Sequence, residues 1–124
     1  MNVVDSSGWL EYFADGPNAA AFAKPIHTIT QLIVPSVTLF EVFKRVMTQR
    51  DEDAALEAVA MMRQGQVVPL DDALALEAAR LSVTHRIPMA DSIILATARA
   101  HRATLWTQDA DFKDLQDVRY LAKE

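Results

Sequence analysis

The sequence predicts an α/β fold, with a mostly parallel central sheet of four to five strands and helices on both faces. Short apolar runs alternate along the 124-residue chain with longer segments of helical periodicity, the pattern of strands joined by crossover helices. The run at residues 3–5 is apolar up to its last residue, which suits a central strand buried on both faces of a parallel sheet. The length suits one domain with a proper core, so we expect a single domain over residues 1–124.

The first half of the chain follows this opening strand with two helical segments and a second strand. Residues 6–16 predict a short helix, because serines at its start can cap it and a glycine at its end can stop it. Residues 17–29 are rich in alanine and form a second helical candidate, disturbed by Pro25. Residues 31–35 predict the next strand.

Two more helices are expected before the third strand. Ser36 can cap a helix over residues 37–50, whose apolar side chains supply a buried face. Acidic residues at positions 51–53 open a further helix that ends at Gly65. Residues 66–70 predict the third strand, so this connection carries more helix than the simplest doubly wound unit.

The second half of the chain continues the alternation. An acidic pair caps a helix over residues 71–86, and a proline separates it from a helix over residues 89–102. Residues 103–107 predict the fourth strand. A turn with a short helix at residues 107–115 follows, and residues 118–121 form a possible edge strand.

Composition excludes several classes of protein. No apolar stretch approaches the roughly 20 residues that span a bilayer, and the N-terminus lacks the pattern of a signal peptide, so we expect a cytoplasmic protein without membrane contact. The chain has no cysteine, which excludes disulfides and thiolate zinc sites. Its net charge of -5 argues against a dedicated nucleic-acid binder, but less against a nuclease, whose metal-binding acids add to the negative charge.

Four acidic residues stand where this fold would turn their carboxylates toward one another. Asp5 ends the first strand and Asp109 follows the fourth, and a parallel sheet collects its functional groups at the carboxyl ends of its strands. Glu41 and Asp91 lie in helical segments between them. Carboxylates in one cleft repel one another unless they are protonated or share a cation, and Mg²⁺ and Mn²⁺ prefer such oxygen ligands. The pattern indicates a metal-dependent enzyme acting on phosphates.

Each of these acids also has a purely structural explanation. Asp5 can cap the helix that follows it, and Asp109 can do the same for the short helix after it. Asp91 stands in the first turn of a helix, where the helix dipole favours negative charge. Glu41 can form a surface ion pair with Arg45, one turn further along. The residues alone leave both interpretations open.

Taken together, VVDSS near the start, the helical Glu41, ADSIILATA with Asp91 and TQDADF near the end resemble the PIN domain. The resemblance covers essentially the whole chain and is strongest to the small ribonuclease toxins of bacterial toxin–antitoxin pairs, the VapC type. It implies a single PIN-like domain. One departure is Phe40, at the position directly before the acid where many relatives place a small hydroxyl residue.

The resemblance also implies residue roles, a cofactor and partners. The acidic quartet of the family, catalytic and binding Mg²⁺ or Mn²⁺, corresponds to Asp5, Glu41, Asp91 and Asp109. Its supporting residues correspond to Ser6, Thr107 and Asp111. The implied activity is endonucleolytic cleavage of RNA. The implied partners are the RNA substrate, a small antitoxin that inserts a segment near the active site and blocks it, and a second copy of the chain in a homodimer.

RNA would need cations at the rim of such a site. Side chains that could hold its phosphates, or could instead be ordinary helix-end cations, are Lys44, Arg45, Arg50, Arg99, His101 and Arg102.

Two alternatives compete with a nuclease. A phospho-receiver signalling domain also combines a parallel sheet with an acidic Mg²⁺ pocket, but it would have paired acids after the first strand and a lysine after a late strand. Here VVDSS carries one acid, and Lys113 comes too late, although Asp71 or Asp72 could serve as the phosphoryl acceptor. The second alternative is a PIN fold without catalysis, acting as a scaffold.

Overall fold

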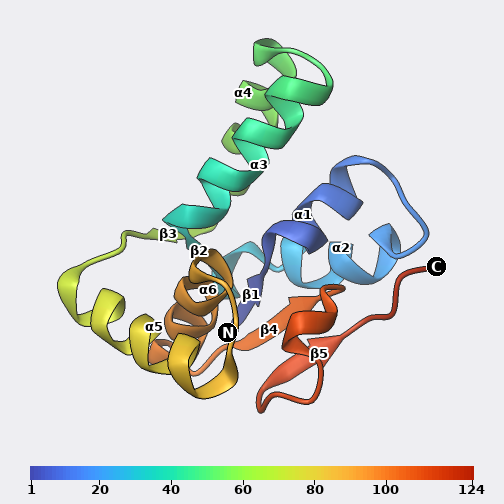
Figure 1. Ribbon diagram of the computed structural model, residues 1–124. Helices are drawn as coiled ribbons and strands as arrows, with labels where there is room; N and C mark the ends of the chain where they lie inside the picture. The colour runs from blue at the N-terminus through green and yellow to red at the C-terminus, as the bar shows by residue number, and fades with distance from the viewer.

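The structure, a computed structural model, describes residues 1–124 and contains one five-stranded sheet (Figure 1). The strands are β1 (Asn2–Val4), β2 (Leu32–Pro35), β3 (Gln66–Val68), β4 (Thr104–Thr107) and β5 (Val118–Tyr120). They lie in the order β3-β2-β1-β4-β5, and every neighbouring pair is parallel. The predicted parallel sheet is therefore confirmed, with β1 at its centre and β5 at one edge.

Six α-helices connect the strands: α1 (Ser6–Phe13), α2 (Ala19–His27), α3 (Ser36–Gln49), α4 (Glu52–Met62), α5 (Asp72–His85) and α6 (Met89–Ala100). Two 3-10 turns, η1 (Ile29–Gln31) and η2 (Ala110–Phe112), complete the list. Asp51 and Asp71 cap α4 and α5 through their side chains, as the sequence predicts. The prediction that Ser36 caps α3 is wrong, because Pro35 occupies that position and Ser36 is the first helical residue.

Helices cover both faces of the sheet, because successive strand residues point to opposite sides. Val3 and Ile33 belong to a core that α5 and α6 close, whereas Val4 and Val34 belong to a second core with α1, α2, α3 and α4. The central strands are therefore buried on both faces, which explains why the first strand is apolar without alternation. None of the helices combines the length and the apolar composition that a membrane-spanning segment requires.

The chain order reverses beside β1, and this reversal creates the site. The first connections lead from β1 outward to β2 and β3, and the connection after β3 returns to place β4 on the other side of β1. Ligand sites of open parallel sheets lie outside the carboxyl ends of the strands at such a reversal. The order also differs from the 2-1-3-4-5 order of receiver domains, which removes the fold on which that alternative depends.

Candidate active site

Asp5 follows β1 at the centre of this edge and is only 2% exposed. Its Oδ1 accepts hydrogen bonds from the backbone N–H of Gly8 (2.9 Å) and from the Ser7 hydroxyl (2.7 Å). Its Oδ2 accepts a bond of 2.6 Å from the Thr107 hydroxyl. The capping role that the sequence allows is thus real, and the same bonds hold the carboxylate in one orientation at the carboxyl end of the strand.

Thr107 links the ends of β1 and β4. Its hydroxyl donates to Asp5 and accepts a hydrogen bond from the backbone N–H of Asp109, at 2.9 Å. Asp109 in turn caps η2, because its Oδ1 accepts from the backbone N–H of Asp111 at 2.9 Å. These bonds use one oxygen of Asp109, which leaves its Oδ2 without a partner in this network.

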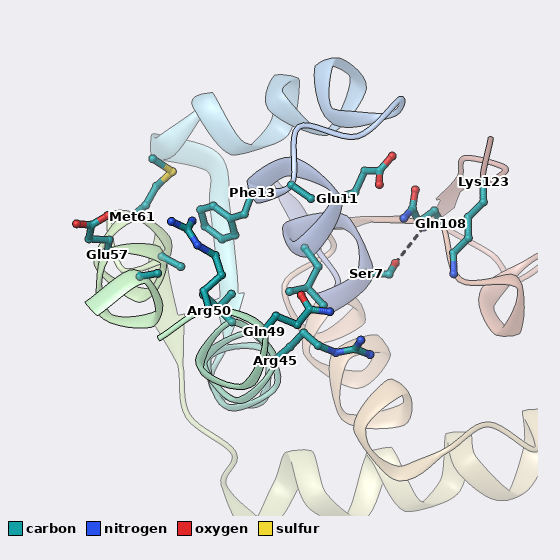
Figure 2. Close-up of a pocket in the computed structure, with 15 residues that line it drawn as sticks. Ser7, Glu11, Phe13, Arg45, Gln49, Arg50, Glu57, Met61, Gln108 and Lys123 are labelled. Atoms are coloured by element: carbon teal, nitrogen blue, oxygen red, sulfur yellow. Dashed lines mark hydrogen bonds between the residues drawn. The ribbon is translucent and has the colours of Figure 1, made fainter. Parts of the chain in front are cut away.

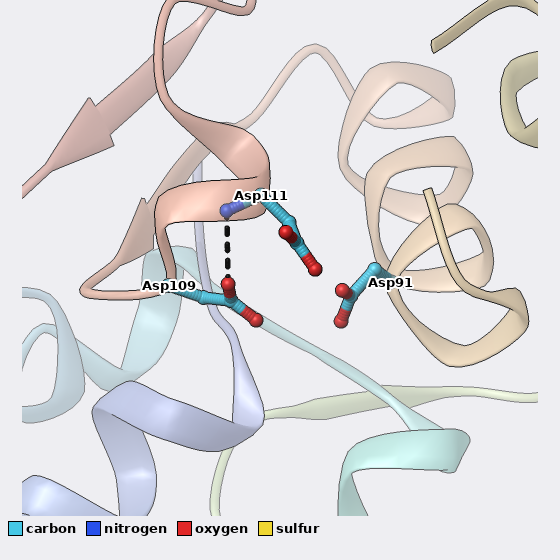
Figure 3. A group of neighbouring side chains, drawn as sticks. All are labelled: Asp91, Asp109 and Asp111. Carbon is cyan, nitrogen blue, oxygen red and sulfur yellow. Dashed lines mark hydrogen bonds between the residues drawn. The ribbon is translucent and has the colours of Figure 1, made fainter. Parts of the chain in front are cut away.

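Three carboxylates converge at this edge of the sheet. Asp91, in the first turn of α6, lies beside Asp109 and Asp111, and one carboxylate oxygen from each lies within 4.8 Å of the others. Figure 3 shows the three side chains turned toward a common point, from α6 on one side and η2 on the other. Asp111, expected only in a supporting role, is therefore as close to this point as the other two acids.

Glu41 reaches the site from another helix, α3. It lies in the middle of α3, and its Oε1 accepts a hydrogen bond of 2.5 Å from the Ser6 hydroxyl. This bond joins α1 to α3 and holds the carboxylate at the wall of the site. Glu41, Asp5, Asp91 and Asp109 all line one cavity of about 450 Å³. The four predicted acids are thus brought together, with Lys44 and Arg45 among the other lining residues.

The pKa values of two of these acids move toward neutrality. Burial raises the pKa of Asp5 to about 6, although the hydrogen bonds from Thr107, Ser7 and Gly8 act to lower it. Burial raises the pKa of Asp91 to about 7, and the neighbouring charge of Asp109 adds to the effect. Both shifts mean that ionising all the carboxylates of the cluster at once is unfavourable in the absence of a cation. A bound cation would remove that penalty.

The donor set fits a hard divalent cation. All the converging atoms are carboxylate oxygens, the ligands that Mg²⁺ and Mn²⁺ prefer. Oxygens that bind one Mg²⁺ at about 2.0–2.1 Å lie about 3 Å apart when adjacent and about 4 Å apart across the ion, so oxygens within 4.8 Å of one another must move closer together to share an ion. Asp91, Asp109 and Asp111 could hold such an ion directly, and Asp5 and Glu41 line one cavity together with Asp91 and Asp109.

Sequence reasoning missed Ser7, and the structure leaves two of the candidate phosphate-binding cations outside the site. The hydroxyl of Ser7 bonds to both oxygens of Asp5 and accepts the backbone N–H of Gln108, so it joins α1 to the chain after β4. A second serine after an acid carries no signal of this in the sequence. Arg99 lies about 12 Å further along the axis of α6 from Asp91, at 1.5 Å per residue, and His101 follows it beyond the helix end. These cations therefore lie away from the site.

Comparison with known proteins finds a matching family model and solved structures of similar fold. A family model described as the PIN domain matches residues 3–118. A toxin–antitoxin complex from Klebsiella pneumoniae contains a chain that is 20% identical, with 100% of both chains covered and a TM-score of 0.83. VapC20 of Mycobacterium tuberculosis, a toxin that cleaves the sarcin–ricin loop, is 17% identical, with 94% of this chain and 95% of VapC20 covered and a TM-score of 0.78.

A third similar structure is DNA-bound VapBC from Salmonella typhimurium. It contains a chain that is 14% identical, with 98% of both chains covered and a TM-score of 0.77. Curated proteins gave no significant match. At these identities the structures establish a shared fold over the full length of the chain.

Proposed function

Because this chain belongs to the PIN-domain family, we propose that it is a metal-dependent endoribonuclease that cleaves phosphodiester bonds of RNA. The observation that best supports the proposal is the convergence of Asp91, Asp109 and Asp111 at the carboxyl edge of the sheet. VapC20, which shares the fold, cleaves an RNA loop, and this favours RNA as the substrate.

In this proposal the acids divide into two groups. Asp91, Asp109 and Asp111 hold a Mg²⁺ or Mn²⁺ ion, and Asp5 and Glu41 complete the acidic site on its other side. When bound, the ion supplies a water of lowered pKa and stabilises negative charge on the phosphate oxygens.

The hydroxyl groups keep the second pair of acids in place. Ser7 and Thr107 fix the orientation of Asp5, and Ser6 fixes that of Glu41. Fixed carboxylates can orient the attacking water and accept its proton without first having to reorganise. Ser6 and Thr107 therefore act as supporting residues, as the family resemblance implies, and Ser7 joins them.

We further propose that the chain is the toxin of a toxin–antitoxin pair and acts in the cytoplasm. Structures of similar fold include toxin–antitoxin complexes, which supports a small antitoxin partner that blocks the site. Homodimer formation is supported by apolar side chains left exposed on α3 and α4, among them Phe40 (65% exposed) and Leu56 (52% exposed).

The test is an incubation of the purified chain with total cellular RNA in Mg²⁺ or Mn²⁺. Discrete products are expected with the wild type, and none with added EDTA or with Asp5→Asn. Glu77→Gln, which removes an exposed charge on α5 far from the cavity, is the matched control and should cleave like the wild type. Absence of cleavage by the wild type, with Mn²⁺ binding still measurable by calorimetry, would refute the nuclease and favour a catalytically silent scaffold.

A further inference from the structure

A second, larger cavity adjoins the acidic one. It has a volume of about 530 Å³ and lies between α1, α3 and α4 (Figure 2). Ser7, Leu10 and Arg45 line both cavities, so the two share a wall and meet at these residues. Arg45 stands one helical turn after Glu41, and its guanidinium is therefore the charged group at the junction.

The two cavities differ in charge. Four carboxylates line the acidic cavity, against the cations Lys44 and Arg45. In the larger cavity the cations Arg45, Arg50 and Lys123 outnumber the acids. One of its acids, Glu11, is already engaged, because its Oε2 accepts the backbone N–H of Asn18 at 2.8 Å. In a chain with a net charge of -5, this is a local surplus of positive charge directly beside the acidic site.

The cations of the larger cavity are available to a ligand. The carboxylates of the site accept their hydrogen bonds from hydroxyl groups and backbone amides, not from Arg45 or Arg50. Figure 2 shows both guanidinium groups extending from α3 on separate sides, with the ammonium of Lys123 descending from the C-terminal segment.

An aromatic ring completes the lining. Phe13 borders the cavity and is held by its neighbours, because it stacks on Trp9 at 5.7 Å between ring centroids and meets Tyr12 edge-on at 5.5 Å. A fixed ring beside cations is the combination that binds single-stranded nucleic acid, where bases stack on aromatic faces and phosphates pair with arginine and lysine. The volume lies within the range of about 300–1,000 Å³ for sites of small organic ligands, enough for a nucleotide.

We propose that this cavity binds the unpaired RNA segment directly adjoining the scissile phosphate, and that Arg45 is the positioning residue that carries the strand from one cavity to the other. The inference rests on the proposed nuclease function. Arg45 binds the phosphate next to the cleaved one, Arg50 and Lys123 bind the phosphates beyond it, and an unpaired base stacks on Phe13. Double-stranded RNA would not present such a base, so the site selects single-stranded or looped RNA.

A binding measurement without cleavage tests the cavity itself. Fluorescence anisotropy of a labelled single-stranded oligoribonucleotide in EDTA gives the Kd at several salt concentrations. Arg45→Gln and Arg50→Gln should each weaken binding and reduce the slope of log K against log salt by about 0.7, the value for one lost phosphate contact on a single strand. Arg80→Gln on the exposed side of α5 is the control, with Kd and slope unchanged.

The contribution of base stacking on Phe13 can be distinguished from that of phosphate binding, because stacking does not change the slope of log K against log salt. Phe13→Leu should weaken binding roughly tenfold, as the loss of one stacked base would, with the salt slope unchanged. Phe13→Tyr keeps an aromatic face and should restore the affinity. Circular dichroism must show that the leucine variant is folded at the assay temperature; if it is not, the salt slopes of Arg45→Gln and Arg50→Gln decide the inference.

Cleavage kinetics then separate this inference from the proposed function. With a long oligoribonucleotide, Arg45→Gln should raise KM several-fold and leave kcat within about twofold, since the residue acts on binding. With a substrate truncated on the side that enters the larger cavity, wild type and variant should converge. If the wild type cleaves and binds RNA but Arg45→Gln and Arg50→Gln behave like Arg80→Gln, the inference is overturned and the cavity serves another occupant, such as a protein segment. If the wild type neither cleaves nor binds RNA, the nuclease proposal fails as well.

Discussion

Asp5 gives both of its carboxylate oxygens to groups of the fold, and the same bonds place it in the acidic cavity. The cap bond from Gly8 belongs to helix α1, and the bond from Thr107 ties the end of β4 to the end of β1. The structural explanation and the functional one therefore do not exclude each other. Asp109 also combines a structural role with a place in the site, since it caps η2 through one oxygen and lines the acidic cavity.

Removing one carboxylate from the cluster should separate activity from folding. Asp91→Asn is expected to lower cleavage by at least about 100-fold, because it deletes a proposed metal ligand. In EDTA at pH 8 the variant should melt at a higher temperature than the wild type, because Asp91 is repelled by Asp109, Asp5 and Glu41. Thermal melts followed by circular dichroism check this, with Glu77→Gln as control. A variant that unfolds at room temperature would make Asp91 a structural residue.

The metal-free protein should lose stability as the pH rises from about 5 to 8. The folded pKa values of Asp5 (about 6) and Asp91 (about 7) lie above the unfolded value of 3.8, so the folded state holds these protons more tightly. Their contribution to the free energy of unfolding is complete below the unfolded pKa and disappears as the pH passes the folded pKa. Urea unfolding in EDTA at both pH values measures it. Equal or greater stability at pH 8 would contradict the assigned shifts.

At the residue scale, the sequence predicted the acids and two of their supporting hydroxyl residues, Ser6 and Thr107, but not Ser7. Asp5, Asp91 and Asp109 stand at strand ends or at a helix start, where carboxylates are recognisable in the sequence, whereas Glu41 was identified only in combination with them and Asp111 through the family resemblance. Ser7 was not, since only the fold brings it beside Thr107, at 3.5 Å between the hydroxyl oxygens. The fold also gives Glu41 a partner that its sequence does not indicate, because Ser6 binds its carboxylate from another helix.

At the scale of elements, α1 decides how closely the site can be assembled. Its glycine, Gly8, faces Val4 and Phe22, and a Cβ at that position would lie 2.7 Å from Val4 Cγ1 and 2.8 Å from Phe22 Cε1. The helix can thus approach β1 and α2 closely enough for its first turn to cap on Asp5. Packing rather than backbone conformation is the reason for the glycine here.

Gly8→Ala should therefore destabilise the protein despite the higher helix propensity of alanine. The expected loss is about 1–3 kcal/mol, the usual cost of forcing an extra methyl group into a packed core. Cleavage should fall as well, because displacing α1 moves Ser6 and Ser7 away from Glu41 and Asp5. Urea denaturation and the RNA assay measure the two effects. A more stable Gly8→Ala variant would show that the side chains of Val4 and Phe22 can move to accommodate the methyl group at little cost.

Element boundaries were predictable where a strong local signal marks them. Asp51 and Asp71 begin helices as predicted, because an acid before an apolar helical segment is a clear capping signal. The predicted cap at Ser36 is wrong although serine is a residue type that suits a cap. Pro35 is the N-cap residue of α3, and Ser36 is the first residue of the helix. The predicted turn with a short helix within residues 107–115 contains the 3-10 helix η2 at Ala110–Phe112.

At the scale of the whole molecule, the acidic site lies where the order of the strands reverses, beside β1. Sequence alternation predicted the parallel sheet, but no local signal fixes the order β3-β2-β1-β4-β5. That order puts the carboxyl ends of β1 and β4 side by side and so joins Asp5 to Asp109. The length of α6 separates its two ends, which is why Asp91 in its first turn reaches the site and His101 at its C-terminal end does not. The adjoining cavity between α1, α3 and α4 depends on the same arrangement and has no counterpart in the sequence.

In the proposed function, the converging carboxylates bind a divalent metal for RNA cleavage. The most direct test is a crystal soaked in Mn²⁺ with diffraction recorded at an energy where manganese scatters anomalously. We expect an anomalous peak between Asp91, Asp109 and Asp111, within about 2.0–2.3 Å of their oxygens, and its loss in Asp91→Asn crystals. A fully soaked crystal without a peak at this point, or with a peak only elsewhere on the surface, would contradict the account.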